Sequence, residues 1–577
     1  GKRASSPVGD RPATKSSTAP AAADRAALDD EGMGEFEDQW EDELADDADL
    51  GEVVDAAEQD DDDDEDEDGA GMEVDGGDQE EARPPSPKPY LPGGKLEEGE
   101  FLAPDLSTYP LLHSFVPTWP SLSFDILRDN DGEERRGYPV SCALVAGTQA
   151  QDPTANEVTV MRWESLGKTR RDESASLLPL SLVHISLSRE LTLLLPLADD
   201  DDEDSDDDDT DDDPVLTYRS IPHKGGVNRI RARPLGNPLS TGPPLPPDPY
   251  HVATFAETGK VHIFDVAPHL NSLLSPATAS STLSKTPLFT INSHGRAEGF
   301  ALDWAKPIGG ASSSARLLSG DIHSKIYLTT LTPTSATPSP KPFASHTDSI
   351  EDIQWSPSEA TVFASCSSDR SIRVWDVRVK DRKSVIGVAG AHDSDVNVIS
   401  WNLSTNYLLA SGGDEGGIKV WDLRNFKGCV SSSSLFLFPL FLFDDGDERE
   451  VPRLTRSLSL SARLQHQGAR TDALAAFNWH TGPITSIEWH PTDESCFAAA
   501  GADDQVTLWD LSVEEDEDER PTGDDADRLK DVPAQLLFCH QGQQDIKEVH
   551  WHPQAPGVVV STASDGFNIF RALPFSS

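Results

Sequence analysis

The second half of the chain repeats a short pattern of alternating apolar and polar residues. Stretches such as "SIRVWDV" (371–377) and "QVTLWDL" (505–511) place apolar residues at every second position, and Asp, Gly and Ser residues separate the stretches. A period of two is typical of strands with one buried face, and the polar residues between them favour tight turns. The pattern therefore predicts short antiparallel strands joined by turns.

These strands belong to a repeat with fixed spacing. In three units, a His is followed nine residues later by a Trp and twenty-nine residues later by the Trp of a Trp-Asp pair. The triples are His346/Trp355/Trp375, His392/Trp401/Trp421 and His480/Trp489/Trp509. Weaker copies cover residues 119–163, 222–266, 293–328 and 539–570, which brings the count to seven. A repeat of four short strands is typical of a β-propeller blade.

The repeat resembles that of the WD40 family, so we predict an all-β fold. The expected architecture is a seven-bladed WD40 β-propeller with an N-terminal helix and disordered acidic segments. We place the propeller at residues 119–577, with inserts at about 168–213, 428–470 and 513–531. Residues 1–88 are rich in acid, Ala, Ser, Pro and Gly, which predicts a disordered tail. Residues 89–118 are expected to form a helical segment that packs on the ring.

The repeated His, Ser, Asp and Trp residues have two interpretations, catalytic and structural. His346, Ser365, Asp369 and Trp375 match a hydrogen-bonded set that WD40 proteins bury within a blade, and the corresponding residues in the other strong units are His392, Trp421, His480, Asp503 and Trp509. We favour the structural role, because buried polar groups need partners and a catalytic triad is not repeated around a ring. The chain also lacks phosphate-loop, zinc-protease and nucleophile-elbow motifs. We expect no enzyme and no cofactor.

The charge of the chain narrows its partners. Its 577 residues include 102 acidic and 47 basic residues, a formal net charge of −55. This excess repels phosphates, so we expect a basic protein partner and no direct contact with nucleic acid or membrane. The apolar stretches 176–198 and 431–443 are interrupted by charge or too short to span a bilayer. Five scattered cysteines without a Cys-x-x-Cys pair indicate a reducing compartment and no zinc or other metal site.

Three runs concentrate the acidic charge: Asp60–Asp68, Asp199–Asp213 and Glu514–Glu519. Neighbouring carboxylates on an extended chain lie about 3.5 Å apart, well inside a Debye length of about 8 Å. They repel one another and attract a Lys/Arg-rich partner over a long range. A role in solubility alone is the competing explanation. The candidate client-binding residues are Asp60, Asp64, Asp68, Asp199, Asp202, Glu203, Asp206, Asp209, Asp213, Glu514, Asp516 and Asp518.

Longer stretches match one group of WD40 proteins more closely. They include "YLPGGKLEEGE" (90–100), "RSIPHKGGVNRIR" (219–231), "FNWHTGPITSIEWHP" (477–491) and "STASDGFNIF" (561–570). With them the chain resembles the glutamate-rich WD-repeat proteins, a family of ribosome-assembly chaperones related to histone-binding WD40 proteins. The resemblance implies a monomeric chaperone of the nucleus and nucleolus. Its implied clients are a basic large-subunit ribosomal protein, the one called L-three, carried to pre-60S particles, and core histones such as an H3–H4 pair.

The histone-binding relatives also suggest a binding groove. In them, a groove between an N-terminal helix and an acidic loop before the last blade receives a histone helix. The resemblance carries the helix side over to Asp105, Leu106, Tyr109, Leu112 and Phe115, and the loop side to Asp524, Asp525, Asp527, Val532 and Pro533. The loop is longer and more acidic than in those relatives, and Ala534 stands where they have a second Pro.

Other functions stay open. The stretches "WDVR" (375–378) and "WDLR" (421–424) fit the Trp-Asp-x-Arg box of substrate receptors in cullin-type ubiquitin ligases, with Arg378 and Arg424 as adaptor contacts. The competing interpretation is that both arginines pair with nearby acids. A histone-binding chromatin factor is a third function. Residues 174–198 and 429–467 depart from the family pattern, and their Ser, Leu, Phe and Pro bias suggests that one or both are translated, retained introns. An amphipathic membrane or partner segment is the competing interpretation.

Overall fold

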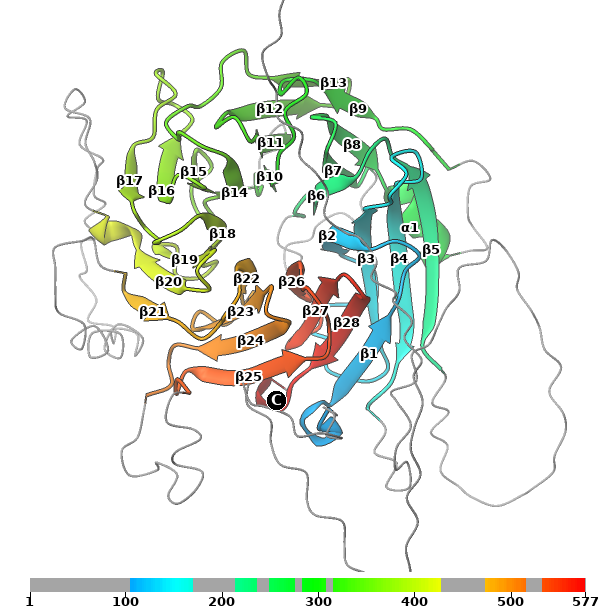
Figure 1. Ribbon diagram of the computed structural model, residues 1–577. Coiled ribbons are helices and arrows are strands. Elements are labelled where there is room, and N and C mark those ends of the chain that lie inside the picture. Colours follow the sequence, from blue (N-terminus) through cyan, green and yellow to red (C-terminus); the bar gives the residue numbers. More distant parts are fainter. Residues whose placement is uncertain are drawn as a thin grey trace, which may run out of the picture. The chain divides into compact units, whose positions relative to one another are not determined.

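The computed structural model of the chain is a ring of seven four-stranded antiparallel sheets around a central axis (Figure 1). It describes residues 104–169, 213–235, 249–275, 283–307, 315–426, 473–514 and 532–575. The predicted seven-bladed all-β propeller is confirmed. The expected disordered tail and the two stretches interpreted as retained introns lie outside the described residues.

The blades are numbered from the first complete sheet in the chain. Blades 1 to 3 are β2 (Ser121–Leu127), β3 (Val140–Thr148), β4 (Glu157–Leu166) and β5 (Val215–Pro222); β6 (Val227–Ala232), β7 (His251–Ala256), β8 (Val261–Asp265) and β9 (Phe289–Ile291); and β10 (Ala301–Trp304), β11 (Ala315–Gly320), β12 (Ile326–Thr332) and β13 (Ser335–Pro338). Blades 4 and 5 are β14 (Ile350–Trp355), β15 (Val362–Ser367), β16 (Ser371–Asp376) and β17 (Ile386–Ala389); and β18 (Val396–Trp401), β19 (Leu408–Gly413), β20 (Ile418–Asp422) and β21 (Ala475–Phe477). Blade 6 is β22 (Ile484–Trp489), β23 (Cys496–Gly501), β24 (Gln505–Asp510) and β25 (Leu536–Gln541).

Blade 7 is built from both ends of the described chain. Its first three strands are β26 (Glu548–Trp551), β27 (Val558–Ala563) and β28 (Gly566–Arg571), and its outer strand is β1 (Leu111–Phe115). The pairing runs from Leu111 opposite Arg571 to Phe115 opposite Phe567. An early segment of the chain therefore closes the ring.

The expected helical segment covered residues 89–118, of which 89–103 lie outside the described residues, and this closure corrects the expectation for the rest. Among the described residues of that segment, a single 3-10 turn, Leu106–Thr108, is followed by strand β1. Pro110 lies between them and has no backbone N–H for a continuing helix. The open edge of β28 supplies backbone hydrogen-bond partners that an isolated helical turn would lack, so Leu111–Phe115 form a strand and not a helix.

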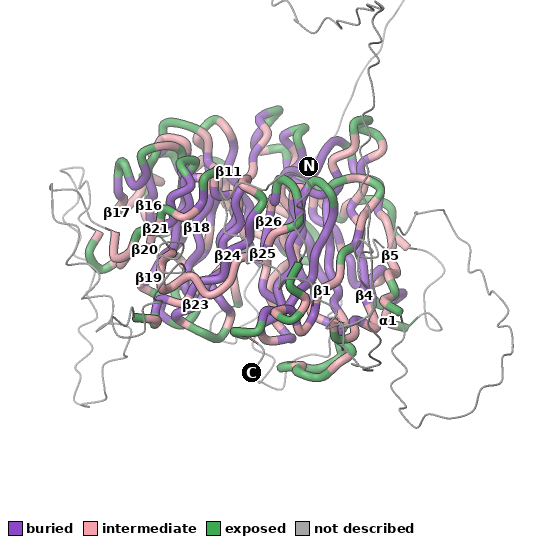
Figure 2. Tube along the Cα trace, turned by 60° about the horizontal axis from the view of Figure 1, so that its bottom comes forward, coloured by how far each residue is buried: buried purple, intermediate pink, exposed green. Residues whose placement is uncertain are grey.

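The core lies between the blades. The second strand of five blades is buried along its whole length, as in β15 and β23. Close approach of neighbouring blades requires small residues there: a Cβ added to Gly412 would lie 2.4 Å from Ile484 Cγ2 of the next blade. Figure 2 shows the buried strands in the middle of the ring and the exposed residues at the turns.

The connections between strands divide the ring into two faces. Because successive strands alternate in direction, the first-to-second and third-to-fourth connections of every blade open on one face, which we call the insert face. The internal segments outside the described residues are 170–212, 236–248, 276–282, 308–314, 427–472 and 515–531, and each is a connection of this kind. All of them therefore leave the ring from the insert face, where the chain also begins β1 and ends β28.

Helical structure is minor in the described part of the chain. Helix α1 (Ala267–Leu274) follows β8 and packs on β4 and β5 through residues such as Leu270 and Leu273. No helix in the described ranges is long and apolar enough to cross a membrane.

Candidate functional site

The Trp-Asp repeats each contain a buried hydrogen-bonded set. In blade 4, His346 Nδ1 lies 3.0 Å from Asp369 Oδ2, and His346 Nε2 lies 2.8 Å from Ser365 Oγ. Trp375 Nε1 donates to the same Ser365 Oγ at 2.8 Å. The His346 side chain has no exposed area. Its ring is thus occupied by partners within the blade and is not offered to a substrate.

Blades 5 and 6 contain the same set with one substitution each. In blade 5 a Glu takes the place of the Asp. In blade 6 Ala499 stands at the Ser position, and Thr507 of the third strand makes the hydrogen bonds instead. The contacts are His392 with Glu415 (2.5 Å) and Ser411 (2.7 Å), Trp421 with Ser411 (2.8 Å), His480 with Asp503 (2.9 Å) and Thr507 (2.9 Å), and Trp509 with Thr507 (2.7 Å). Repetition in three blades indicates a structural role.

The acidic runs are described only where they join the propeller. Asp213 lies just before β5 and Glu514 lies after β24, and both are exposed. The other predicted residues of the runs lie outside the described residues: Asp60, Asp64, Asp68, Asp199, Asp202, Glu203, Asp206, Asp209, Asp516 and Asp518. The connections that carry the two internal runs both join a third strand to a fourth strand. Both runs are therefore tethered to the insert face.

The residues expected on the helix side of the groove have two different environments. Tyr109 and Phe115 are buried: Tyr109 Oη lies 2.9 Å from His540 Nδ1, and the Phe115 ring stacks on Trp163 with centroids 4.3 Å apart. These two side chains belong to the core of the ring and not to an open groove. Burial accordingly raises the pKa of the Tyr109 hydroxyl above its usual value.

The remaining groove residues are more accessible. Asp105 is exposed and caps the 3-10 turn by accepting a hydrogen bond from Ser107 N at 3.0 Å. Leu106, Leu112, Val532 and Pro533 are half-buried. The other residues of the expected loop, Asp524, Asp525 and Asp527, lie outside the described residues.

The N-terminal segment, residues 105–113, contacts the strand ends that precede or follow both acid-bearing connections. On one side, Thr169 N donates to Pro110 O at 3.2 Å, just before residues 170–212. On the other side, Tyr109 packs edge-on against Phe538 of β25, with ring centroids 5.2 Å apart, just after residues 515–531. Two connections far apart in sequence thus join the ring beside the same short segment.

Arg378 and Arg424, the expected ligase-adaptor contacts, are exposed at equivalent positions of blades 4 and 5. Each guanidinium binds the carboxylate two residues before it, Asp376 or Asp422, at 2.7 Å. Their side chains are 66% and 56% exposed, respectively. Arg424 also lies 3.5 Å over the Tyr407 ring. Both arginines therefore pair with their own Asp, and both keep a large exposed surface on the insert face.

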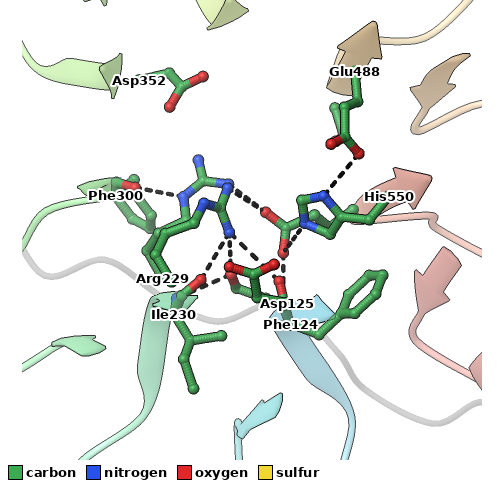
Figure 3. A network of polar contacts seen from close by, with 12 residues as sticks. Phe124, Asp125, Arg229, Ile230, Phe300, Asp352, Glu488 and His550 are labelled. Atoms are coloured by element: carbon green, nitrogen blue, oxygen red, sulfur yellow. Dashed lines mark hydrogen bonds and ion pairs between the residues drawn. The ribbon is translucent and has the colours of Figure 1, made fainter. Parts of the chain in front are cut away.

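A buried charge network at the ring axis was missed by the sequence analysis (Figure 3). Glu548 of β26 accepts hydrogen bonds from Phe124 N at 2.8 Å, Arg229 Nη1 at 2.9 Å and Arg231 Nη2 at 2.7 Å. Its side chain is 1% exposed. One carboxylate therefore joins the innermost strands of blades 7, 1 and 2.

His550 extends the network to blade 6. Its Nδ1 lies 3.0 Å from Glu488 Oε2 and its Nε2 lies 3.7 Å from Glu548 Oε2. Burial alone would lower the pKa of His550, but the two carboxylates raise it to about 10. The pKa of Glu548 is held well below its usual value: burial opposes this, but Arg231, His550 and Arg229 outweigh it. The network is thus charged on both sides at neutral pH.

A second set of hydrogen bonds near the axis joins the innermost strands of neighbouring blades. In four blades, the residue before the last residue of the innermost strand accepts a backbone N–H from the next blade, and in blade 1 Asp125, two residues before the end of β2, does the same. The pairs are Ala232 N to Asp125 Oδ2 (2.7 Å), Trp355 N to Asp303 Oδ2 (2.7 Å), Trp401 N to Gln354 Oε1 (2.7 Å), Trp489 N to Ser400 Oγ (3.1 Å) and Trp551 N to Glu488 Oε2 (2.9 Å). In the four blades whose innermost strand ends in Trp304, Trp355, Trp401 or Trp489, the polar residue directly before that Trp was the sequence signal that could have revealed these hydrogen bonds.

Comparison with protein families recovers the repeats and the N-terminal segment. A model described as "WD domain, G-beta repeat" matches residues 339–376, 383–422 and 472–510. A model described as "Histone-binding protein RBBP4", or the equivalent member of the CAF1 complex, matches residues 99–167. The second match spans the 3-10 turn, β1 and most of blade 1.

Individual relatives match most of the chain. The "Ribosome assembly protein rrb1" of Schizosaccharomyces pombe is 41% identical over 95% of this chain and 94% of its own length. The "Protein HEAT STRESS TOLERANT DWD 1" of Arabidopsis thaliana is 39% identical over 82% of this chain and 88% of its own length. The "Glutamate-rich WD repeat-containing protein 1" of Dictyostelium discoideum is 38% identical over 83% of each chain.

Proposed function

This chain belongs to the glutamate-rich WD-repeat family, together with the ribosome assembly protein of Schizosaccharomyces pombe, and we propose that it is a ribosome biogenesis factor. In this proposal the protein is a chaperone that shields a basic client on the insert face of the propeller. The client is the basic large-subunit ribosomal protein called L-three, delivered to pre-60S particles in the nucleolus. The protein acts as a monomer, without direct contact to nucleic acid or membrane.

The observation that carries this proposal is the common origin of the acidic segments. The segments that contain Asp199–Asp213 and Glu514–Glu519 both connect to the insert face, and the chain that follows Asp60–Asp68 begins β1 at the same face. Dense carboxylates attract a Lys/Arg-rich protein over long range and gain from counterion release, and a rigid ring beside them adds shape. A role in solubility would not require one common face.

Core histones are the second client class in this proposal. The match of residues 99–167 to the histone-binding description supports an H3–H4 pair as a partner. Of the residues expected to line the groove, Tyr109 and Phe115 are buried and offer little surface to a histone helix. A chromatin role would use the same acidic face.

A salt series tests the proposal. Binding of the full chain to the L-three type ribosomal protein and to H3–H4 is measured by titration between low and physiological salt, beside a variant that lacks Asp199–Asp213. We expect tight binding to the ribosomal protein that weakens steeply with salt and collapses in the variant. Equal affinity for H3–H4 would indicate a general shield for basic proteins. No binding to either client would refute the chaperone.

The ligase-receptor function is the second candidate, because Arg378 and Arg424 stay exposed after pairing with Asp376 and Asp422. One relative carries "DWD" in its name. A pull-down with the adaptor of a cullin-type ligase, compared with the Arg378→Ala/Arg424→Ala variant, tests it. Capture that depends on both arginines would support a receptor, and capture by neither protein would exclude it.

A further inference from the structure

The outer strands of the seven blades differ in how their free edges are protected. An unprotected edge strand presents backbone N–H and C=O groups on which another strand can pair. Four outer strands have only three or four residues: β9, β13, β17 and β21. Short strands offer few backbone groups to an incoming chain.

The outer strands β5 and β1 are protected in other ways. β5 carries Arg219 and ends at Pro222, and a charge or a Pro discourages pairing on an edge. Residues 167–169, which directly follow β4, lie against β1 and the residue before it. Thr169 N donates to Pro110 O at 3.2 Å, and His113 Nε2 lies 3.0 Å from Gly167 O. Six of the seven outer strands are therefore short, charged or covered.

β25 is the exception. It has six residues, "LLFCHQ", without a charged residue or a Pro. Five of its residues, including Leu536, Leu537 and Phe538, are only half-buried. Within the described part of the chain, β24 is the only strand that pairs with β25. A bulge near the start of the strand leaves Leu537 without an opposite residue in β24, and Phe538–Gln541 continue the pairing in register. Among the described outer strands, β25 is therefore the longest without a charged residue, a Pro or a covering segment.

We propose that the outer edge of β25 binds an extended segment of the basic client by β-strand addition. This inference rests on the proposed chaperone function and specifies how the client is held. Strand addition obtains affinity from main-chain hydrogen bonds and specificity from alternate side chains. It differs from the helix-in-groove mode implied by the histone-binding relatives.

The surroundings of β25 fit an extended chain with basic and apolar side chains. Glu514 is exposed at the start of the connection that leads into β25, and Asp105 is exposed four residues before Tyr109, whose ring contacts Phe538 of the strand. Leu536, Leu537 and Phe538 of the strand are themselves half-buried, so β25 offers apolar side chains beside its edge. Lys or Arg residues of the client would meet the acids while its apolar residues meet these side chains.

Hydrogen–deuterium exchange of the full chain with and without the L-three type ribosomal protein tests the inference. Strand addition predicts slower exchange of the amides in Leu536–Gln541, because outward N–H groups gain partners. Protection confined to Leu106–Leu112 would indicate the groove instead and overturn the inference. Unchanged exchange of β25 in a complex that still forms would overturn it while leaving the chaperone function intact. A client that does not bind refutes both.

A matched pair of variants adds an independent measurement. Leu537→Lys puts a charge on the open edge, and Ile386→Lys puts the same charge on the half-buried outer strand β17. Thermal unfolding checks that both variants fold. We expect the client affinity to fall about tenfold for Leu537→Lys and to change little for Ile386→Lys. Equal affinities for the two variants would contradict the inference.

Discussion

Glu548 is the residue at which three separate parts of the chain meet. Its carboxylate accepts hydrogen bonds from the backbone N–H of Phe124, 424 residues earlier in the chain, and from the guanidinium of Arg229, 319 residues earlier. Glu548 is 1% exposed, and its carboxylate compensates two guanidinium charges whose side chains are only 13% and 18% exposed. A single side chain thus contributes to the closure of the whole ring.

Glu548→Gln tests this contribution. The amide keeps the size of the side chain but removes the ion-pair partner of Arg229 and Arg231, and breaking a largely buried pair is strongly destabilising. We expect the free energy of unfolding in urea to fall by about 3 kcal/mol at neutral pH. Glu134→Gln, on an exposed turn, serves as the control. Equal stabilities of the two variants would contradict the role assigned to Glu548.

The raised pKa of His550 predicts a pH dependence of stability. Its folded value of about 10 lies above the ordinary value of 6.5. Between these values the folded chain binds more protons than the unfolded chain, so the stabilisation is complete below pH 6.5 and is lost as the pH rises toward 10. The wild type should therefore lose more unfolding free energy than His550→Gln between pH 7 and about 10.

The control for this experiment is His323→Gln, which changes an exposed His in a turn. It should follow the wild type across the same pH range. If His550→Gln also follows the wild type, the positive charge assigned to His550 in the network is wrong.

Residues in one repeat were accessible to sequence reasoning, and residues between repeats were not. His346, Ser365 and Trp375 lie within thirty residues, so the fixed spacing revealed the repeat, and its resemblance to WD40 proteins predicted their contacts. Glu548 and Arg229 sit in weak repeats at opposite ends of the propeller, and no local spacing connects them. The contact exists only after the ring closes.

At the scale of elements, strand β1 explains how the ring closes. It supplies the outer strand of blade 7, although it precedes blade 1 in the chain. Phe115 and Leu111 are buried in a cluster with residues of blades 1 and 7. The sequence analysis expected a helix here because the histone-binding relatives have an N-terminal helix in the corresponding segment. The stretch "LLHSF" has no period-two alternation that would predict a strand, and the need for a fourth strand appears only in the closed sheet.

Two truncations test the role of β1. A chain that starts at Pro104 keeps β1 and should unfold cooperatively at the same temperature as the full chain. A chain that starts at Val116 lacks β1, exposes the edge of β28 and should unfold at a clearly lower temperature. Differential scanning calorimetry measures both. Identical transitions for the two truncations would show that β1 does not close the ring.

At the scale of the whole molecule, the insert face organises the proposed function. The propeller itself was predictable because its strong repeats fix blade length and strand period. The sequence did not predict the face of the ring that carries the acidic runs, because that face depends on the order of the strands within each blade. In the structure, third-to-fourth connections carry both internal runs, and β1 begins on the same face.

The central claim is that a basic client binds on the insert face, and two charge-matched variants test it most directly. One replaces six acids of an insert, Asp199, Asp200, Asp201, Asp202, Glu203 and Asp204, by their amides. The other replaces six exposed acids of the opposite face by Asn: Asp348, Asp395, Asp414, Asp504, Asp545 and Asp565. Both variants lose the same net charge, so their difference reports position alone.

The decisive measurement is the salt dependence of binding of the L-three type ribosomal protein to both variants and to the wild type. We expect weaker binding and a shallower salt dependence for the insert variant, and wild-type behaviour for the opposite-face variant. Equal losses in both variants would mean that net charge alone attracts the client. A loss confined to the opposite-face variant would place the client on the other side of the ring and contradict the account.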